Sequence, residues 1–197
     1  IECVAGWKEG FTFYKAGKYK TALKELLPSA NGGNADAQYL IGDIYSSGLG
    51  VDRKEDYVAI NNSQAVGWYR KAAVQGHPYA QFALGLMYKI GEVVPQDYSQ
   101  AADWYRKAAE QGDTKSLFNL GEMYKKGEGV AKNLVLAHIF YNLAAVNGDE
   151  YRKSRDEITV KLTSAQLSEA QELASKWVIN QPLPTITQTY PSSSKEN

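Results

Sequence analysis

The sequence has few of the residues that build metal sites or covalent cross-links. Cys3 is the only cysteine, which excludes an intrachain disulfide and a cysteine-rich metal site. His77 and His138 are the only histidines, and neither has a second histidine at the short spacing typical of metal ligands. We therefore expect no metal site and no bound cofactor.

Net charge and long apolar runs are also absent. Basic and acidic residues balance at 22 each, whereas a nucleic-acid-binding domain usually has a high pI, so we expect no nucleic-acid partner. No apolar run approaches the roughly 20 residues of a membrane helix, and no signal peptide is visible. Because the sequence begins with Ile1 and not Met, we expect that an upstream segment is missing.

The common catalytic motifs are missing as well. There is no Gly-x-Ser-x-Gly elbow for a serine nucleophile, and no glycine-rich loop ends in Gly-Lys-Ser/Thr, as a phosphate-binding loop would. We predict that the protein is not an enzyme and that it has no catalytic residues.

An internal repeat is the strongest positive signal in the sequence. The segment Trp104–Ala109 repeats Trp68–Ala73 residue for residue after a period of 36 residues. Gly76, Gly112 and Gly148 follow the same period, and we expect each to end a helix in the left-handed conformation. Periods of this length are typical of stacked helical hairpins.

The unit before these is longer. Gly42, in Ile41–Tyr45, precedes its counterpart Gly85 by 43 residues, and the surplus lies between Gly48 and Ala65. An insertion there lengthens the turn between two helices at little free-energy cost. We expect the helices of this unit to be preserved.

Apolar residues within each unit recur with helical spacing. Gly85 and Ala108 are small enough to let two helices approach closely, and Trp104 and Tyr105 are large enough to fill the space beside them. The sequence therefore predicts an all-α solenoid of antiparallel helix pairs. The helical stripe in one second helix consists of Ala101, Trp104, Tyr105, Ala108 and Ala109.

The pattern also divides the chain into segments. We predict an N-terminal hairpin over residues 1–34 and three repeats over residues 35–149, divided as 35–77, 78–113 and 114–149. Capping helices are expected over residues 150–180, since solenoid ends need atypical units, and Thr163 with Gln166 can form a capping box there. Residues 181–197 are rich in proline, serine and threonine, which predicts a disordered tail.

The spacing Ala-x-x-x-Leu-Gly-x-x-Tyr, followed by Ala-x-x-Trp-Tyr-x-x-Ala-Ala-x-x-Gly, resembles the Sel1-like repeat family, and the first hairpin resembles a tetratricopeptide repeat. This resemblance implies a right-handed α–α superhelix and a role in protein–protein interaction. It also implies that the first helix of each pair lines the concave surface. Many bacterial members are periplasmic or secreted, which we take as the expected compartment, with the cytoplasm as the alternative.

If the helix positions of a tetratricopeptide repeat are applied to this sequence, they indicate which residues are expected to face a ligand. Aromatic and basic side chains are common anchors of binding surfaces, so a protein or peptide partner is expected on this face. The candidate binding residues are Trp7, Phe11, Tyr14, Tyr39, Asp43, Tyr79, Phe82, Leu86, Lys89, Phe118, Glu122 and Lys125.

Other interpretations remain open at this point. The aromatic residues are either ligand contacts or packing between adjacent hairpins. The same rings would also suit a cell-envelope glycan, because sugars stack on aromatic faces. A β-lactamase-like hydrolase is a third alternative, and either open face of a short solenoid is also compatible with self-association.

Overall fold

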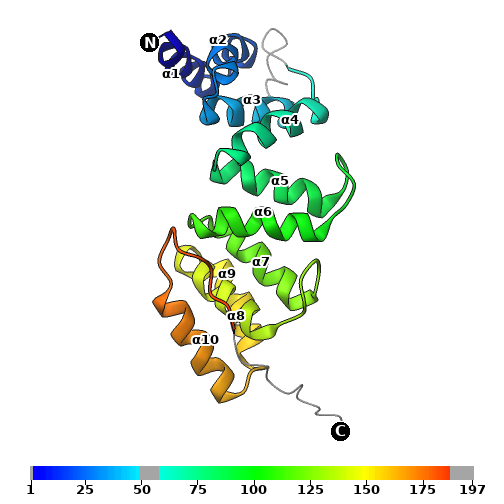
Figure 1. Cartoon of the computed structure of the whole chain (residues 1–197), viewed down its shortest axis with the longest axis vertical. Coiled ribbons are helices and arrows are strands. Elements are labelled where there is room, and N and C mark those ends of the chain that lie inside the picture. Colours follow the sequence, from blue (N-terminus) through cyan, green and yellow to red (C-terminus); the bar gives the residue numbers. More distant parts are fainter. Residues whose placement is uncertain (1, 49–57, 187–197) are drawn as a thin grey trace.

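The structure is a computed structural model that describes residues 2–48 and 58–186. These residues form ten α-helices and one 3₁₀ helix and contain no strand. Figure 1 shows an elongated stack with α1 at one end and α10 at the other. The helices are α1 (Glu2–Lys15), α2 (Tyr19–Asn31), α3 (Ala35–Ser47), α4 (Asn62–Val74), α5 (Pro78–Ile90), α6 (Tyr98–Glu110), α7 (Thr114–Lys126), α8 (Leu134–Ala144), η1 (Ala145–Asn147), α9 (Asp149–Thr159) and α10 (Ser164–Lys176).

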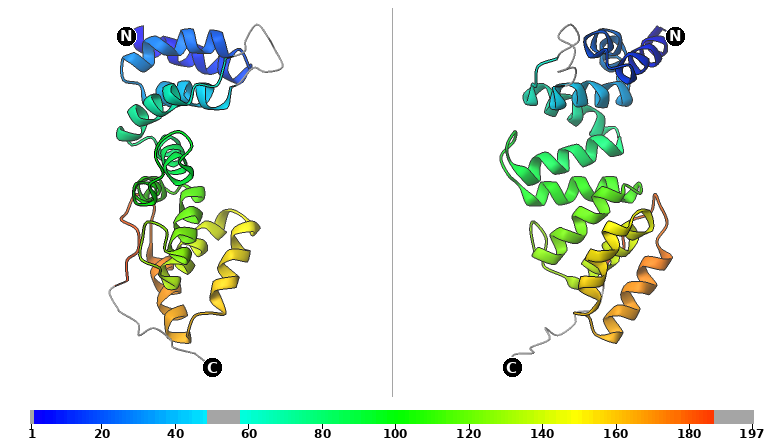
Figure 2. Two further views of the ribbon diagram at one scale, coloured as in Figure 1. Left: turned by 90° about the vertical axis from the view of Figure 1, so that its right-hand side faces the viewer. Right: turned by 180° about the vertical axis from the view of Figure 1, so that it is seen from behind.

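Consecutive helices pair into hairpins, and the hairpins stack in chain order. The closest pairs are α1 with α2, α3 with α4, α5 with α6, and α7 with α8, and each hairpin then packs on the next. Two views at right angles show the same sequential stacking (Figure 2). The predicted all-α solenoid of antiparallel helix pairs is confirmed.

One close contact recurs in all three repeats and sets the distance between paired helices. A Cβ atom added to the first-helix glycine would lie less than 3 Å from the ring of a second-helix tyrosine, closer than real Cβ atoms approach. Only glycine therefore lets the two helices meet over that ring. The pairs are Gly42 with Tyr69, Gly85 with Tyr105, and Gly121 with Tyr141.

Buried glutamines link one repeat to the next. Gln81 Nε2 donates a hydrogen bond to the Ala73 carbonyl at 3.1 Å, and Gln81 Oε1 accepts one from Gln111 Nε2 at 2.8 Å. Gln38 makes the equivalent pair of bonds one repeat earlier. These bonds satisfy the polar groups that close packing removes from water.

A side-chain cap begins the first helix of each repeat. Asn34, His77 and Asp113 each accept a hydrogen bond from a backbone N–H in the first turn. Gly76 and Gly112, before two of these caps, have the predicted left-handed backbone. Gly148 does not: its φ of 175° is extended, because η1 replaces the end of the second helix in the last repeat.

The surplus is expected between Gly48 and Ala65, and residues 49–57 of that stretch lie outside the described part of the chain. On its far side the chain rejoins the repeat pattern. The N–H of Asn61 donates to the Tyr45 carbonyl at 2.9 Å. In the next two repeats Asp97 makes the same bond to Tyr88, and Asn133 makes it to Tyr124. The insertion thus leaves the start of the second helix in register.

The C-terminal helices do not form another hairpin. Both α9 and α10 pack mainly against α8, and they lie on different sides of it (Figure 2). The predicted capping box is present, with Thr163 Oγ1 accepting from the Gln166 N–H and Gln166 Oε1 accepting from the Thr163 N–H.

The segment after α10 differs from the disordered tail predicted from residue 181 onward. Leu183 is only 8% exposed because it packs into the core formed by α6, α7, α8 and α10. Just before it, the N–H of Asn180 donates to the Glu110 carbonyl at 2.7 Å. The buried Leu183 side chain and this backbone hydrogen bond hold the segment against the solenoid. Residues 187–197 of the predicted tail lie outside the described part of the chain.

Candidate functional site

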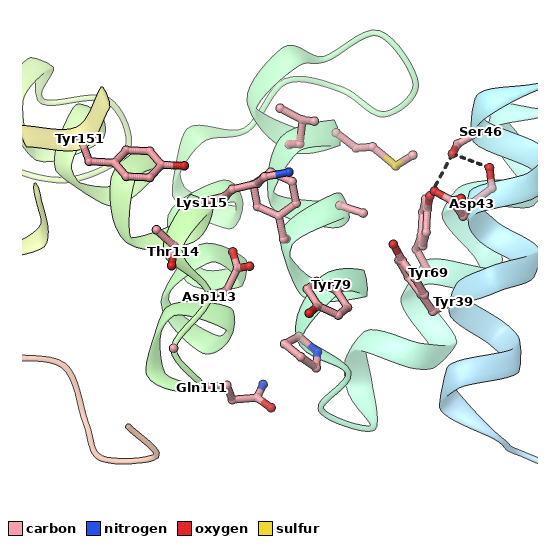
Figure 3. Close-up of a pocket in the computed structure, with 16 residues that line it drawn as sticks. Tyr39, Asp43, Ser46, Tyr69, Tyr79, Gln111, Asp113, Thr114, Lys115 and Tyr151 are labelled. Carbon is pink, nitrogen blue, oxygen red and sulfur yellow. Dashed lines mark hydrogen bonds between the residues drawn. The ribbon is translucent and has the colours of Figure 1, made fainter. Parts of the chain in front are cut away.

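A pocket of about 640 Å³ lies where the first helices of the three repeats meet, and we call it the central pocket. Figure 3 shows α3 on one side, α5 along its floor, and the start of α7 with a side chain from α9 on the other. Its volume falls within the range of roughly 300–1,000 Å³ common for ligand sites. The lining residues are Tyr39, Asp43, Ser46, Tyr69, Pro78, Tyr79, Phe82, Ala83, Leu86, Met87, Gln111, Gly112, Asp113, Thr114, Lys115 and Tyr151.

Aromatic rings form one wall of the central pocket. The Tyr39 ring lies 5.9 Å from the Tyr69 ring and 5.9 Å from the Tyr79 ring, measured between centroids. Tyr79 is 58% exposed, whereas Tyr39 is half-buried. Burial, together with the nearby charge of Asp43, raises the pKa of Tyr39 to about 12, so this phenol stays neutral at physiological pH.

Asp43 brings a carboxylate to the same wall. The Tyr14 hydroxyl donates a hydrogen bond to Asp43 Oδ2 at 2.5 Å, and burial and this bond both raise the pKa of Tyr14. The hydroxyls of Ser46 and Tyr69 lie 2.9 Å apart one helical turn away. Among the described residues, no lysine, arginine or histidine forms an ion pair with Asp43.

The opposite wall comes from the α6–α7 turn and from α9. Asp113 accepts a hydrogen bond from the Ser116 N–H at 2.8 Å and thereby caps α7. Lys115 Nζ lies 5.9 Å from the centroid of the Phe82 ring, on the floor of the pocket. Tyr151 reaches this wall from α9 (Figure 3).

His77 caps the N-terminus of α5 beside the aromatic wall. Its Nδ1 accepts a hydrogen bond from the Ala80 N–H at 3.3 Å, and its Nε2 lies 3.3 Å from Asp36 Oδ1. The imidazole also stacks on Tyr39 with centroids 4.6 Å apart. Burial lowers the pKa of His77 although the Asp36 carboxylate opposes this, which keeps the ring neutral and its Nδ1 free to accept.

Five of the twelve residues predicted to bind a ligand meet in the central pocket. They are Tyr39, Asp43, Tyr79, Phe82 and Leu86. A sixth, Tyr14, lies behind the wall, where it supports Asp43. Most of the lining comes from the first helices α3, α5 and α7.

The other predicted residues lie elsewhere along the first helices. Trp7 and Phe11 stack on each other on α1, with centroids 5.3 Å apart. Phe118 packs between rings of α8 and α9. Three polar residues of this group are held in contacts of their own. Lys89 donates to an asparagine, Glu122 accepts from the Tyr141 hydroxyl, and Lys125 pairs with Glu122.

The alternative reading of the aromatic residues as packing also has support from the contacts. Tyr39, Phe82 and Phe118 each lie within 6 Å of the tyrosine ring that covers the repeat glycine. These half-buried rings therefore pack the hairpins and, in two of the three repeats, also line the central pocket.

Sequence reasoning missed three important lining residues. They are Tyr69, Asp113 and Tyr151, and none of them is among the twelve predicted binding residues. The position of Asp113, one residue before a groove-lining helix, was a usable signal. Nothing in the repeat pattern indicates Tyr151, because α9 lies outside the repeats.

The described part of the chain contains neither a metal-binding cluster nor a membrane-spanning helix. No group of three or more histidine, cysteine, aspartate or glutamate side chains has a geometry that would hold a metal ion. No helix within residues 2–48 and 58–186 combines the length and apolar character needed to cross a membrane.

Comparisons with known proteins place this geometry in a family. The Sel1 repeat model matches residues 35–77, 78–113 and 114–149. A crystal structure of a Sel1 repeat protein from Oxalobacter formigenes shares 36% identity with a TM-score of 0.67, over 81% of this chain and 62% of that one. The comparison with curated proteins found no match.

Two further solved structures share the architecture. One is c5321, described as a protective antigen of uropathogenic Escherichia coli strains with an SLR fold, at 30% identity and a TM-score of 0.57. The match covers 88% of this chain but 45% of that one. The other is cysteine rich protein B of Helicobacter pylori, at 20% identity and a TM-score of 0.51, over 68% of this chain and 92% of that one, which supports the fold alone.

The chain spans less than two thirds of the length of the first two structures. The Sel1 matches nevertheless cover more than half of this chain, and they coincide with its stacked hairpins. The chain belongs to the Sel1 repeat family.

Proposed function

We propose that the chain is a non-catalytic scaffold that binds a protein or peptide partner in the central pocket. The observation that carries this proposal is the exposure of large apolar and aromatic side chains inside a pocket. Tyr79 is 58% and Leu86 37% exposed, and both line it. Folding alone does not require them there, and exposed apolar surface within a concavity is typical of binding sites.

The repeat architecture supports the same proposal. The Sel1 repeat fold often serves as an interaction scaffold, and the hairpins are held by glycine, alanine and tyrosine contacts that do not involve Tyr79. Tyr79 is thus available to a partner without disturbing the glycine–tyrosine contacts between paired helices.

A peptide selection tests this proposal. The purified full chain is immobilised and used to select binders from a library of short random peptides. We expect binders whose affinity falls at least about tenfold in Tyr79→Ala, because interface aromatics commonly contribute more than about 1.4 kcal/mol. Val74→Ala, at a position 69% exposed on α4 and outside the pocket, is the matched control.

Other outcomes of this experiment would overturn the proposal. Failure to select any peptide, or binding that Tyr79→Ala leaves unchanged, would remove the peptide site. Binding on a glycan array that depends on Tyr79, with no peptide selected, would favour the glycan alternative. Turnover of nitrocefin by the purified protein would contradict the non-catalytic assignment.

The proposed compartment is the periplasm or the extracellular space, as the resemblance implies. Fractionation of the native cells, followed by detection with an antibody against the chain, tests this. Recovery with the cytoplasmic fraction would contradict it.

A further inference from the structure

The carboxylate of Asp43 differs from the residues at the same place in the other repeats. The residue after the first-helix glycine is Asp43, then Leu86, then Glu122. Glu122 has its charge balanced by two lysines at 3.4 Å, and Leu86 has no charge. Asp43 is the one acidic group of this set that lies in the central pocket, and no ion pair balances it within the described residues.

A hydrogen bond from a neighbouring helix holds the Asp43 carboxylate in position. The Tyr14 hydroxyl donates to one of the two carboxylate oxygens at 2.5 Å. Tyr14 and Tyr39 both have a raised pKa, mainly because of burial, so neither adds a negative charge of its own. A carboxylate can accept roughly four hydrogen bonds, which leaves acceptor capacity toward the pocket.

We infer that the central pocket binds a partner peptide through an arginine or lysine side chain, whose cationic head pairs with Asp43 beside the aromatic wall that Tyr39 and Tyr79 form. This inference rests on the proposed peptide-binding function. A cation is attracted both by a carboxylate and by the faces of aromatic rings. An acidic or purely apolar side chain would desolvate the Asp43 carboxylate without supplying a cation to balance its charge.

The floor of the pocket suits the rest of such a side chain. Phe82, Leu86 and Met87 form an apolar surface on α5, against which the methylene stem of arginine or lysine can pack. The pocket's volume of about 640 Å³ leaves space for neighbouring residues of a peptide. Lys115, the basic residue of the lining, lies on the far wall from Asp43 (Figure 3).

The test compares a cationic peptide with an uncharged copy of itself. The probes are a peptide selected from the random library and its counterpart in which citrulline replaces the arginine, or norleucine the lysine. We expect the uncharged copy to bind the unmodified chain at least about tenfold more weakly, as expected for a hydrogen-bonded charge pair. This comparison needs no protein variant and is independent of any folding defect.

A protein variant then tests whether the charge of Asp43 is the one that binds the cationic peptide. Asp43→Asn keeps the size of the side chain and one oxygen acceptor but removes the charge. We expect it to weaken the cationic peptide about tenfold and the uncharged copy by less than about twofold, because the lost attraction is specific to the pair. Asp103→Asn, at an exposed position on α6 outside the pocket, is the matched control and should change neither affinity.

The outcomes separate the inference from the proposed function. If peptides that depend on Tyr79 lack a basic residue, or if Asp43→Asn weakens both probes equally, the cationic recognition is wrong while the scaffold remains. If no peptide is selected, or Tyr79→Ala has no effect on those selected, the proposed function fails and the inference falls with it.

Discussion

The contact between Gly85 and Tyr105 gives a sharp prediction about stability. A Cβ atom at residue 85 would lie 2.6 Å from Cδ1 and 2.7 Å from Cε1 of the Tyr105 ring, about 1 Å inside the ordinary contact distance. Tyr105 is fully buried, so its ring cannot turn away into solvent. Gly85→Ala must therefore push α5 and α6 apart.

The magnitude follows from two opposing effects. Overpacking of this kind costs about 1–3 kcal/mol, whereas alanine in a helix is favoured over glycine by about 1 kcal/mol. We expect Gly85→Ala to lower the free energy of unfolding by up to about 2 kcal/mol. For a chain of this size, each kcal/mol corresponds to a drop of about 2–4 °C in the melting temperature.

Gly67→Ala is the matched control. Gly67 lies inside α4, and a Cβ atom there would meet nothing within 4 Å. The same substitution should therefore raise the free energy of unfolding by up to about 1 kcal/mol. Urea and thermal unfolding, followed by far-UV circular dichroism, measure both variants. If Gly85→Ala proves as stable as Gly67→Ala, close packing against the tyrosine does not set the helix spacing.

Three further predictions use other contacts. The buried Tyr105 hydroxyl has no hydrogen-bond partner in the described structure, so Tyr105→Phe should leave urea stability unchanged or raise it, whereas Tyr69→Phe should lower it by about 1 kcal/mol through loss of the bond to its serine. Burial lowers the pKa of His77, so the unfolded chain binds the proton more tightly and stability should fall as the pH drops below about 6.5. His77→Asn keeps the helix cap and should reduce that fall in melts across a pH series. Leu183→Ala should cost about 2 kcal/mol in urea unfolding, and an unchanged midpoint would contradict the anchoring of the C-terminal segment.

Much of the fold could be predicted because the packing contacts repeat. A period of 36 residues places Gly85 and Gly121 at equivalent points, and it does the same for the tyrosines that cover them. Helical spacing of apolar residues then identifies both helices of each pair. The family resemblance added the side of the solenoid on which to look for a ligand.

The parts that sequence reasoning missed depend on contacts without a period. Tyr151 reaches the central pocket only because α9 packs on α8, and Leu183 is buried only because the chain turns back after α10. Such long-range packing has no signature in residue spacing. Gly148 illustrates the same limit, because the last repeat ends in η1 and the glycine is extended where the period predicts a left-handed turn.

The positions that repeat and the positions that vary along the solenoid have different physical roles. Ala72, Ala108 and Ala144 occupy one position of the second helix, and all three are fully buried, because a close-packed interior tolerates little change in volume. The second residue of the first helix faces outward and carries three different chemistries. Asp36, Tyr79 and Lys115 occupy it in successive repeats, as an acid, an aromatic ring and a base. The last two line the central pocket, so the departures from the repeat, rather than the repeat itself, give the pocket its chemical character.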